Sequence, residues 1–293
     1  MDNTTLKIML KKFALHIIAL VGYCAFLPLW PGRRKSKLVI LRYHSVSDFR
    51  RHEVNVKIKS FKKQMEFLHR YFSIISLQEA LKILKEKKRL PRRAAVVTFD
   101  DGYEDNYTNA FPVLKESKIP ALIFLTAGFI GTRKIMPHDA GDNPAYNYLL
   151  SWNQVMEMAH EGITFGSHTL THANLGANWV DVNREIRESK QIIEKRLNGQ
   201  VWAISYPFGL RRDFNQEVKR LSERAGYTCA CSAMNGANGY RSDIFALKRI
   251  GIEASDTMFT FRAKLNGALD LLEIKDWPVF NWLLRLCNKI LGV

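Results

Sequence analysis

The residues with the clearest chemical potential are two adjacent aspartates. Asp100 and Asp101 follow the apolar run 94–99 and precede Gly102, a residue type that lets a chain turn sharply. Two neighbouring carboxylates at the end of a strand can divide their work, since one can bind a cation while the other accepts a proton. An Asp-Gly pair alone also marks ordinary turns. The chemistry therefore needs support from other parts of the chain.

A histidine pair provides part of that support. His168 and His172 follow the apolar run 163–166, and a spacing of four places both imidazoles on one face of a helical turn, where they can grip one metal ion. Most histidine pairs with this spacing are incidental. A third segment, 205–209, follows another apolar run. Its proline and glycine predict either a loop whose backbone N–H groups face a site or a simple turn.

The surrounding elements predict how these segments meet. Between residues 37 and 262, short β-rich runs alternate with amphipathic helical patterns, which is typical of a parallel sheet with crossover helices, closed or nearly closed into a barrel. The carboxyl ends of such strands gather on one rim, so the three segments would share a site. We expect strands at 37–46, 94–100, 121–130, 163–168, 201–207 and 227–233, and helices at 60–71 (N-cap Ser60), 76–88 (N-cap Ser76), 109–117, 152–162, 180–197 and 213–226.

Together these motifs resemble carbohydrate esterase family 4, the polysaccharide deacetylases that share the nodulation-type deacetylase domain. Residues 98–102 (TFDDG) match the first motif of that family and residues 167–172 (SHTLTH) its second, within a resemblance that covers roughly 37–252. The order of YHSV, SFKKQM and TFDDGY is most similar to the branch that includes the biofilm poly-N-acetylglucosamine deacetylases. The resemblance implies an α/β fold, a distorted (β/α) barrel of about seven parallel strands.

The resemblance also implies a catalytic metal centre with Asp100 as the base. The ion would be divalent, commonly Zn²⁺, although Ni²⁺, Co²⁺ or Mn²⁺ could serve. Two imidazoles and one carboxylate leave open positions on such an ion, and the ion lowers the pKa of bound water towards ~7. The backbone N–H of Tyr206, in the loop with Pro207, would stabilise the oxyanion. The implied metal ligands are Asp101, His168 and His172.

The general acid is not at the family's usual position. Members usually carry a His shortly after a Leu near the end of the domain, whereas this chain has LKRI at 247–250. Ser205 stands where many members carry an Arg, and no clear Asp-x-x-Asp-Trp motif is present, so the residues that would orient Asp100 are not identified. His44, in the strand-end segment RYHSV, is the expected acid. A structural histidine in a loop is the alternative.

The two ends of the chain predict membrane association. Residues 13–30 form an uncharged, largely apolar run between basic clusters, just short of the ~20 residues that a bilayer span needs. We expect 1–36 to be an uncleaved anchor or re-entrant segment, with a cleaved signal peptide or a buried helix as alternatives. The catalytic domain would span 37–262. The tail, 263–293, ends in an amphipathic pattern at 276–293, typical of an interfacial helix or of a helix packed on the domain.

Charge and motifs together define the expected partners. With 44 basic and 28 acidic residues, the chain has a net charge of +16, which favours anionic partners. No nucleic-acid motif accompanies that charge, so we expect neither nucleic acid nor an obligate protein partner. His138 lies in 132–148, a Gly-, Pro- and Asn-rich insertion that is equally compatible with a lid and a surface loop.

The expected function is hydrolysis at a membrane, on a side that the sequence does not define. The enzyme would be metal-dependent and remove acetyl groups from N-acetylated sugars, on a polysaccharide or on a polyprenyl-phosphate-linked sugar. The alternative is a non-catalytic sugar-binding module that retains the deacetylase fold.

Overall fold

The computed structural model describes residues 9, 12, 13, 16, 17, 37–49, 52–140 and 147–268. The predicted catalytic domain lies almost wholly within this part of the chain. Most of the predicted N-terminal membrane segment and the predicted C-terminal helix at 276–293 lie outside the described residues. Among the residues that are described, no helix is both long and apolar enough to cross a bilayer.

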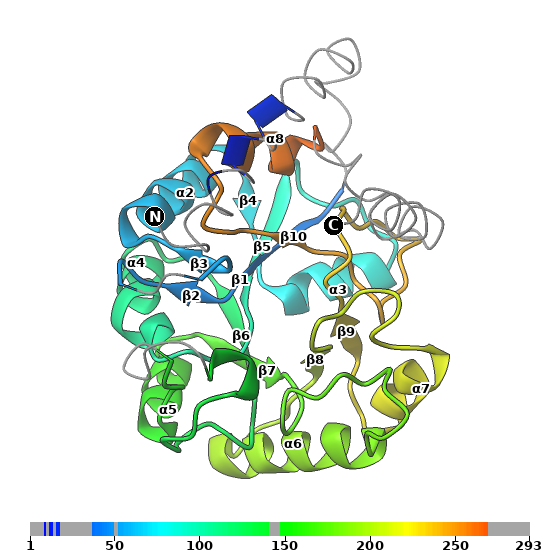
Figure 1. Cartoon of the computed structure of the whole chain (residues 1–293). Coiled ribbons are helices and arrows are strands. Elements are labelled where there is room, and N and C mark those ends of the chain that lie inside the picture. Colours follow the sequence, from blue (N-terminus) through cyan, green and yellow to red (C-terminus); the bar gives the residue numbers. More distant parts are fainter. Residues whose placement is uncertain are drawn as a thin grey trace, which may run out of the picture.

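A curled parallel sheet forms the centre of the domain (Figure 1). Its strands are β1 (Val39–Tyr43), β4 (Ser73–Ile74), β5 (Ala94–Phe99), β6 (Ala121–Leu125), β7 (Thr164–Ser167), β8 (Ala203–Ser205), β9 (Cys229–Cys231) and β10 (Ile250–Gly251). Seven strands follow the order β10-β1-β5-β6-β7-β8-β9, β4 pairs with the start of β5, and every pairing is parallel. The predicted α/β fold with about seven parallel strands is thereby confirmed. Beside the sheet, β2 (Ser45–Val46) pairs with β3 (Asn55–Val56).

One segment links the two edges of this sheet. Leu247 pairs with Cys231 of β9, and Ile250 of β10 pairs with Leu41 of β1. The backbone of Leu247 makes two hydrogen bonds with the β9 region, 2.9 and 2.8 Å long. Residues 247–251 therefore satisfy backbone groups of both edge strands and give the sheet the form of a distorted barrel.

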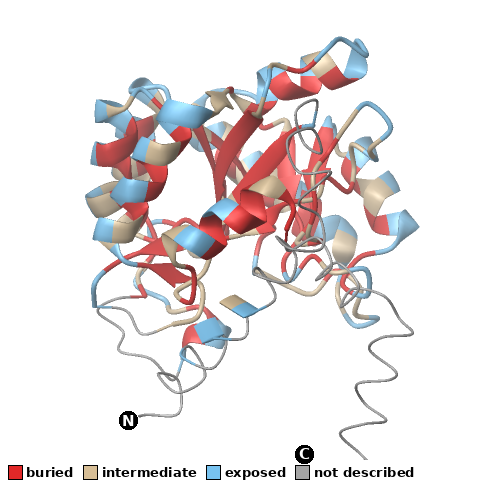
Figure 2. Ribbon diagram, turned by 90° about the horizontal axis from the view of Figure 1, so that it is seen from above, coloured by how far each residue is buried: buried red, intermediate tan, exposed pale blue. Residues whose placement is uncertain are grey.

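Helices pack against the sheet through their apolar faces (Figure 2). The buried apolar side chains form two hydrophobic clusters. Successive residues of β5 enter different clusters because side chains alternate along a strand. Val97 belongs to the larger cluster, shared with most helices, and Val96 to the smaller one, which α3 completes. The helices are α2 (Ile58–Tyr71), α3 (Leu77–Lys85), the π-helix η2 (Asn106–Ala110), α4 (Phe111–Glu116), the 3₁₀ turn η3 (Pro137–Asp139), α5 (Trp152–His160), α6 (Val182–Leu197), α7 (Gln216–Arg224) and α8 (Met258–Asn266).

The first residues of α3 and α2 show where the local sequence is enough to predict the start of a helix and where it is not. Ser76 caps α3 as predicted, since its hydroxyl accepts the N–H of Glu79 at 3.1 Å. The predicted cap at Ser60 is wrong, because α2 begins earlier, at Ile58. Asp48, ten residues away, accepts the N–H of Ile58 at 3.2 Å. A side chain from another loop thus satisfies the first turn of α2.

Candidate metal and catalytic site

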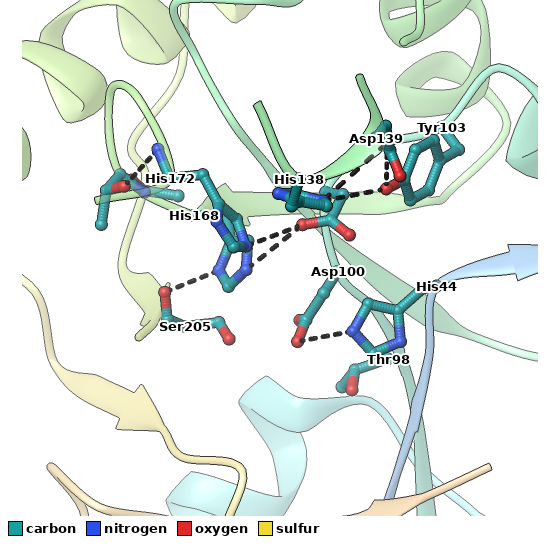
Figure 3. Close-up of polar contacts among 12 residues, drawn as sticks. His44, Thr98, Asp100, Tyr103, His138, Asp139, His168, His172 and Ser205 are labelled. Carbon is teal, nitrogen blue, oxygen red and sulfur yellow. Dashed lines mark hydrogen bonds and ion pairs between the residues drawn. The ribbon is translucent and has the colours of Figure 1, made fainter. Parts of the chain in front are cut away.

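Three predicted metal ligands meet at the carboxyl ends of β5 and β7. Asp101 Oδ1 lies 3.4 Å from Nε2 of His168 and 3.4 Å from Nε2 of His172 (Figure 3). The three side chains offer ligand atoms within 4.8 Å of one another. Two atoms bound at about 2.1 Å to one ion, at a tetrahedral angle, lie about 3.4 Å apart. The donor set and its spacing therefore fit a divalent cation such as Zn²⁺.

Burial prepares the two histidines to bind a cation. Removal of their rings from water lowers the pKa of His168 to about 3 and that of His172 to about 4. Both rings are therefore neutral at neutral pH, as metal ligation requires. Nδ1 of His168 lies 2.8 Å from the carbonyl oxygen of Ser205 and donates to it, so Nε2 keeps the lone pair that faces Asp101.

The loop that carries the histidines is not helical. The predicted helical turn is wrong, since Thr169 and His172 have left-handed backbones with φ of 67° and 61°. Glu185 of α6 holds this loop in place. Its carboxylate accepts the N–H groups of Leu170 and Thr171, both at 2.9 Å, and the Thr171 hydroxyl at 2.6 Å. A clamped loop, not helical spacing, brings the imidazoles together.

Asp100 is held by an arginine whose role the sequence motifs did not reveal. The two terminal nitrogens of Arg249 donate to the two oxygens of Asp100, both at 2.7 Å, and one also donates to Ser205 Oγ at 2.8 Å. Both partners of the ion pair are buried. Burial alone would raise the pKa of Asp100, but the guanidinium holds it well below its usual range. Asp100 is thus ionised and fixed in orientation.

The predicted acid, His44, lies beside Asp100. Its Nε2 is 4.0 Å from Oδ2 of Asp100 (Figure 3). Burial lowers the pKa of His44 well below its usual value, and although Asp100 opposes this shift, the cations of Arg42 and Arg249 reinforce it. The imidazole is therefore neutral at neutral pH.

A polar cluster fixes the segment that carries His44. Asn106 donates to the backbone carbonyl of His44 at 2.7 Å and to Asp105 at 3.0 Å. The hydroxyl of Ser45 donates to Asp105, and its oxygen lies 2.9 Å from Oδ1 of Asn55. The π-helix η2 starts at Asn106, and such irregular turns are frequent at functional sites. The cluster thus anchors the His44 segment to the end of β5.

The structure corrects the predicted oxyanion donor. The backbone N–H of Tyr206 donates to the carbonyl oxygen of Cys231 at 3.0 Å and is therefore engaged in the sheet. Pro207 has no N–H group. The next residue, Phe208, is 53% exposed and has a left-handed backbone with φ of 61°. Its ring is centred 5.1 Å from that of His172. The loop therefore presents Phe208, not Tyr206, beside the metal ligands.

Comparison with known proteins assigns the chain to a family. The sequence model described as "Polysaccharide deacetylase" matches residues 87–230. YxkH of Bacillus subtilis (strain 168), which carries the same family name, is 31% identical over 236 residues, or 80% of this chain and 78% of that protein. This chain belongs to the polysaccharide deacetylase family. Members of the family are hydrolases that remove acetyl groups from polysaccharides and use a divalent metal.

Further similarities agree with this family. The poly-beta-1,6-N-acetyl-D-glucosamine N-deacetylase of Staphylococcus epidermidis is 31% identical over 200 residues, which are 64% of this chain and 66% of that protein. Among solved structures, the Streptococcus pyogenes deacetylase PplD, in complex with acetate, matches with a TM-score of 0.64 and 25% identity, over 74% of this chain and 92% of PplD. IcaB from Ammonifex degensii shares the fold, with a TM-score of 0.64 and 24% identity over 80% of this chain and 97% of IcaB. The resemblance inferred from the motifs is confirmed.

The insertion of this deacetylase reaches the site. The sequence left a lid and a surface loop equally open for residues 132–148. The described part of the insertion places the ring of His138 4.6 Å from the ring of His172, measured between centroids. The glycine and proline content of the insertion did not predict this contact between His138 and His172.

Proposed function

We propose that this chain removes acetyl groups from N-acetylated hexosamines in a reaction that depends on a divalent ion, with Zn²⁺ as the expected ion. The observation that carries the proposal is the buried pair of Asp100 and Arg249 beside three converging metal ligands. A carboxylate that is kept ionised next to a cation site is suited to act as a general base. The deacetylase relatives support the reaction class.

Asp100 is the proposed proton acceptor. A divalent ion bound to Asp101, His168 and His172 would polarise the amide carbonyl and lower the pKa of a water molecule. Each oxygen of Asp100 accepts one hydrogen bond from Arg249, which leaves a further lone pair on each oxygen for water. Because the ion pair lowers its basicity, Asp100 takes a proton only from a strongly acidified donor.

His44 is the proposed proton donor to the leaving nitrogen. Its ring is neutral at rest, so it acts as an acid only after it gains the second ring proton. Oδ2 of Asp100 lies 4.0 Å from Nε2, so a small movement of the ring lets the proton that Asp100 has accepted pass to His44. The hydrogen bond from Asn106 to the His44 carbonyl keeps the donor at this place.

The N–H of Phe208 is the proposed hydrogen-bond donor to the oxyanion. Within the described part of the chain, no residue accepts a hydrogen bond from this N–H. It follows Pro207, in the loop that places the Phe208 ring against His172. A backbone donor held by a strained loop needs no reorganisation during the reaction, which favours stabilisation of developing charge.

A non-catalytic sugar-binding module has less support than hydrolysis. That alternative rested on the arginine that this chain lacks before the 205–209 loop. Arg249 occupies the corresponding role, since it binds Asp100 through two hydrogen bonds and contacts Ser205. A purely sugar-binding site would have no use for an ionised carboxylate that is desolvated beside a metal triad, because such a group is costly to bury.

The proposed substrate is a β-1,6-linked N-acetylglucosamine polymer or a polyprenyl-phosphate-linked N-acetylhexosamine, at a membrane. The named activity of the Staphylococcus epidermidis relative supports the polymer. The net charge of +16 and the apolar run at 13–30 support an anionic, membrane-bound substrate. The two substrates share the N-acetylated pyranose that the site would hold.

Acetate release tests this function. The full chain is incubated with soluble β-1,6-N-acetylglucosamine oligomers and with the lipid-linked sugar, with and without a chelator. We expect release that the chelator abolishes and Zn²⁺ restores. Asp100→Asn should retain the metal and lose turnover, whereas His160→Gln, an exposed residue at the end of α5, should retain both. Equal turnover in Asp100→Asn would refute the base, and preference for soluble oligomers would refute the lipid-linked substrate.

A further inference from the structure

The insertion after β6 is tied to the end of β5, where the proposed base and metal ligand lie. Tyr103 forms an antiparallel bridge with Leu149. The N–H of Glu104 donates to the carbonyl of Tyr148 at 2.9 Å, and the N–H of Leu150 donates to Gly102 at 2.8 Å. These contacts fix the C-terminal side of the insertion against the turn that follows Asp101.

A buried carboxylate of the insertion and a tyrosine that follows β5 orient one imidazole. The Tyr103 hydroxyl donates to Oδ2 of Asp139 at 2.8 Å, and Asp139 is buried. The same hydroxyl oxygen lies 3.3 Å from Nε2 of His138. Because a hydroxyl has a single hydrogen, which here goes to Asp139, the oxygen accepts from His138. Nε2 of His138 therefore carries hydrogen, and the ring has one defined orientation.

The oriented ring lies beside one of the metal ligands, His172. Figure 3 shows His138 between the His168–His172 pair and the Asp139–Tyr103 pair. His138 and Phe208 contact His172 with centroid distances of 4.6 and 5.1 Å. The side chain of His138 is 31% exposed, against 11% for His172 and 3% for His168. His138 and Phe208 are therefore accessible rings that contact a metal ligand.

His138 is not one of the converging metal ligands. Among the described residues, the group whose donor atoms all lie within 4.8 Å contains only Asp101 and the two histidines after β7. Nε2 of His138 is engaged with Tyr103. A polar ring at the rim, held by a buried carboxylate yet partly exposed, has the properties of a group that binds a ligand.

We propose that His138 is a substrate-binding residue that contacts the N-acetylated pyranose, and that Tyr103 and Asp139 are positioning residues for its ring. A pyranose offers hydroxyl and amide groups for hydrogen bonds and an apolar face for packing. His138 would supply the polar contact, and Phe208, whose ring also contacts His172, would supply the apolar one. This inference rests on the proposed function, because it names the substrate contact of that same site.

Ligand binding without turnover tests the proposal. Titration calorimetry with a soluble β-1,6-N-acetylglucosamine oligomer is carried out on the Zn²⁺-loaded Asp100→Asn chain, with and without His138→Ala. We expect about five- to tenfold weaker binding after the second change, as for the loss of one hydrogen bond. In the chain with Asp100 intact, KM should rise by a similar factor. Metal stoichiometry should not change.

Two further variants separate contact from general packing. His138→Asn keeps a polar group near the ring position and should recover part of the affinity. Tyr103→Phe keeps the imidazole but removes its acceptor, so we expect a smaller loss than for His138→Ala. His160→Ala is the matched control and should bind as the parent chain does.

The outcomes distinguish this inference from the proposed function. Unchanged oligomer affinity in His138→Ala overturns the inference. Loss of metal in that variant also overturns it, since His138 would then support the ion. Binding that depends on His138 without any acetate release by the unmutated chain would refute hydrolysis and leave the contact supported. Absence of oligomer binding to Asp100→Asn would overturn the inference, whereas acetate release by the unmutated chain would still support the proposed function.

Discussion

Replacement of Arg249 by methionine tests how strongly the buried ion pair supports the fold and the site. Methionine fills similar space but leaves the carboxylate of Asp100 buried without its cation. Removal of one partner of a buried pair costs about 3–5 kcal/mol. The variant also loses the hydrogen bonds of 2.8 Å from Arg249 to Ser205 Oγ and to the carbonyl of Ser232. We therefore expect a loss of stability within this range. Urea unfolding at pH 7 measures the loss.

The pH dependence of that loss has a defined sign. In the unmutated chain the folded pKa of Asp100 lies below its unfolded value, so the pair stabilises the fold above about pH 4 and this stabilisation is lost as the pH falls further. In Arg249→Met, burial raises the pKa of Asp100. The variant should therefore regain stability relative to the unmutated chain as the pH falls towards 4.

Controls make the outcome decisive. Arg220→Met removes an arginine that is 61% exposed, with one ion pair at 3.7 Å, and should leave stability unchanged. Arg249→Lys keeps the charge without the two-pronged geometry and should lose less than Arg249→Met. Adding Asp100→Asn to Arg249→Met should restore part of the stability because no uncompensated charge remains. A loss in Arg249→Met below about 1 kcal/mol, with deacetylation intact, would refute the reasoning.

Three further predictions concern the neighbours of the ion pair. His44→Ala should lower acetate release about 10²- to 10⁴-fold with unchanged metal stoichiometry, and near-normal release would exclude His44 as the acid. Glu185→Gln should weaken Zn²⁺ binding about tenfold in competition titrations, because it loosens the loop that carries His172; unaltered affinity would contradict this role. Zn²⁺ affinity should not fall through histidine protonation between pH 7 and about 5.5, since the pKa values of His168 and His172 are about 3 and 4. A decline centred near pH 6.5 would contradict the lowering of both pKa values by burial.

Sequence reasoning predicted the parts of the site that come from single strand ends. Asp100 and Asp101 follow β5, and His168 follows β7, so each could be placed by one apolar run and the rule that parallel strands share a rim. The alternation of runs also predicted the parallel sheet. Ser76 was predictable as a cap because its partner, Glu79, lies three residues away.

The parts of the site that the sequence did not predict depend on contacts between distant segments. Arg249 binds Asp100 across 149 residues, and its own segment, LKRI, showed only that a histidine was missing. The engagement of the Tyr206 N–H depends on which strand lies beside β8. His138 reaches His172 through an insertion without regular periodicity. Pairing partners of this kind follow from tertiary packing, which local patterns do not encode.

The position of Arg249 also determines the order in which the active centre is completed during synthesis. Asp101 and both histidine ligands leave the ribosome before Arg249, which adjoins β10 in the segment that links the sheet edges. Until that segment docks, Asp100 lacks the guanidinium that keeps it ionised in the folded chain. The three proposed metal ligands are thus synthesised before the arginine that pairs with the proposed base. The proposed base gains its partner only when the polypeptide joins the two edges of its own sheet.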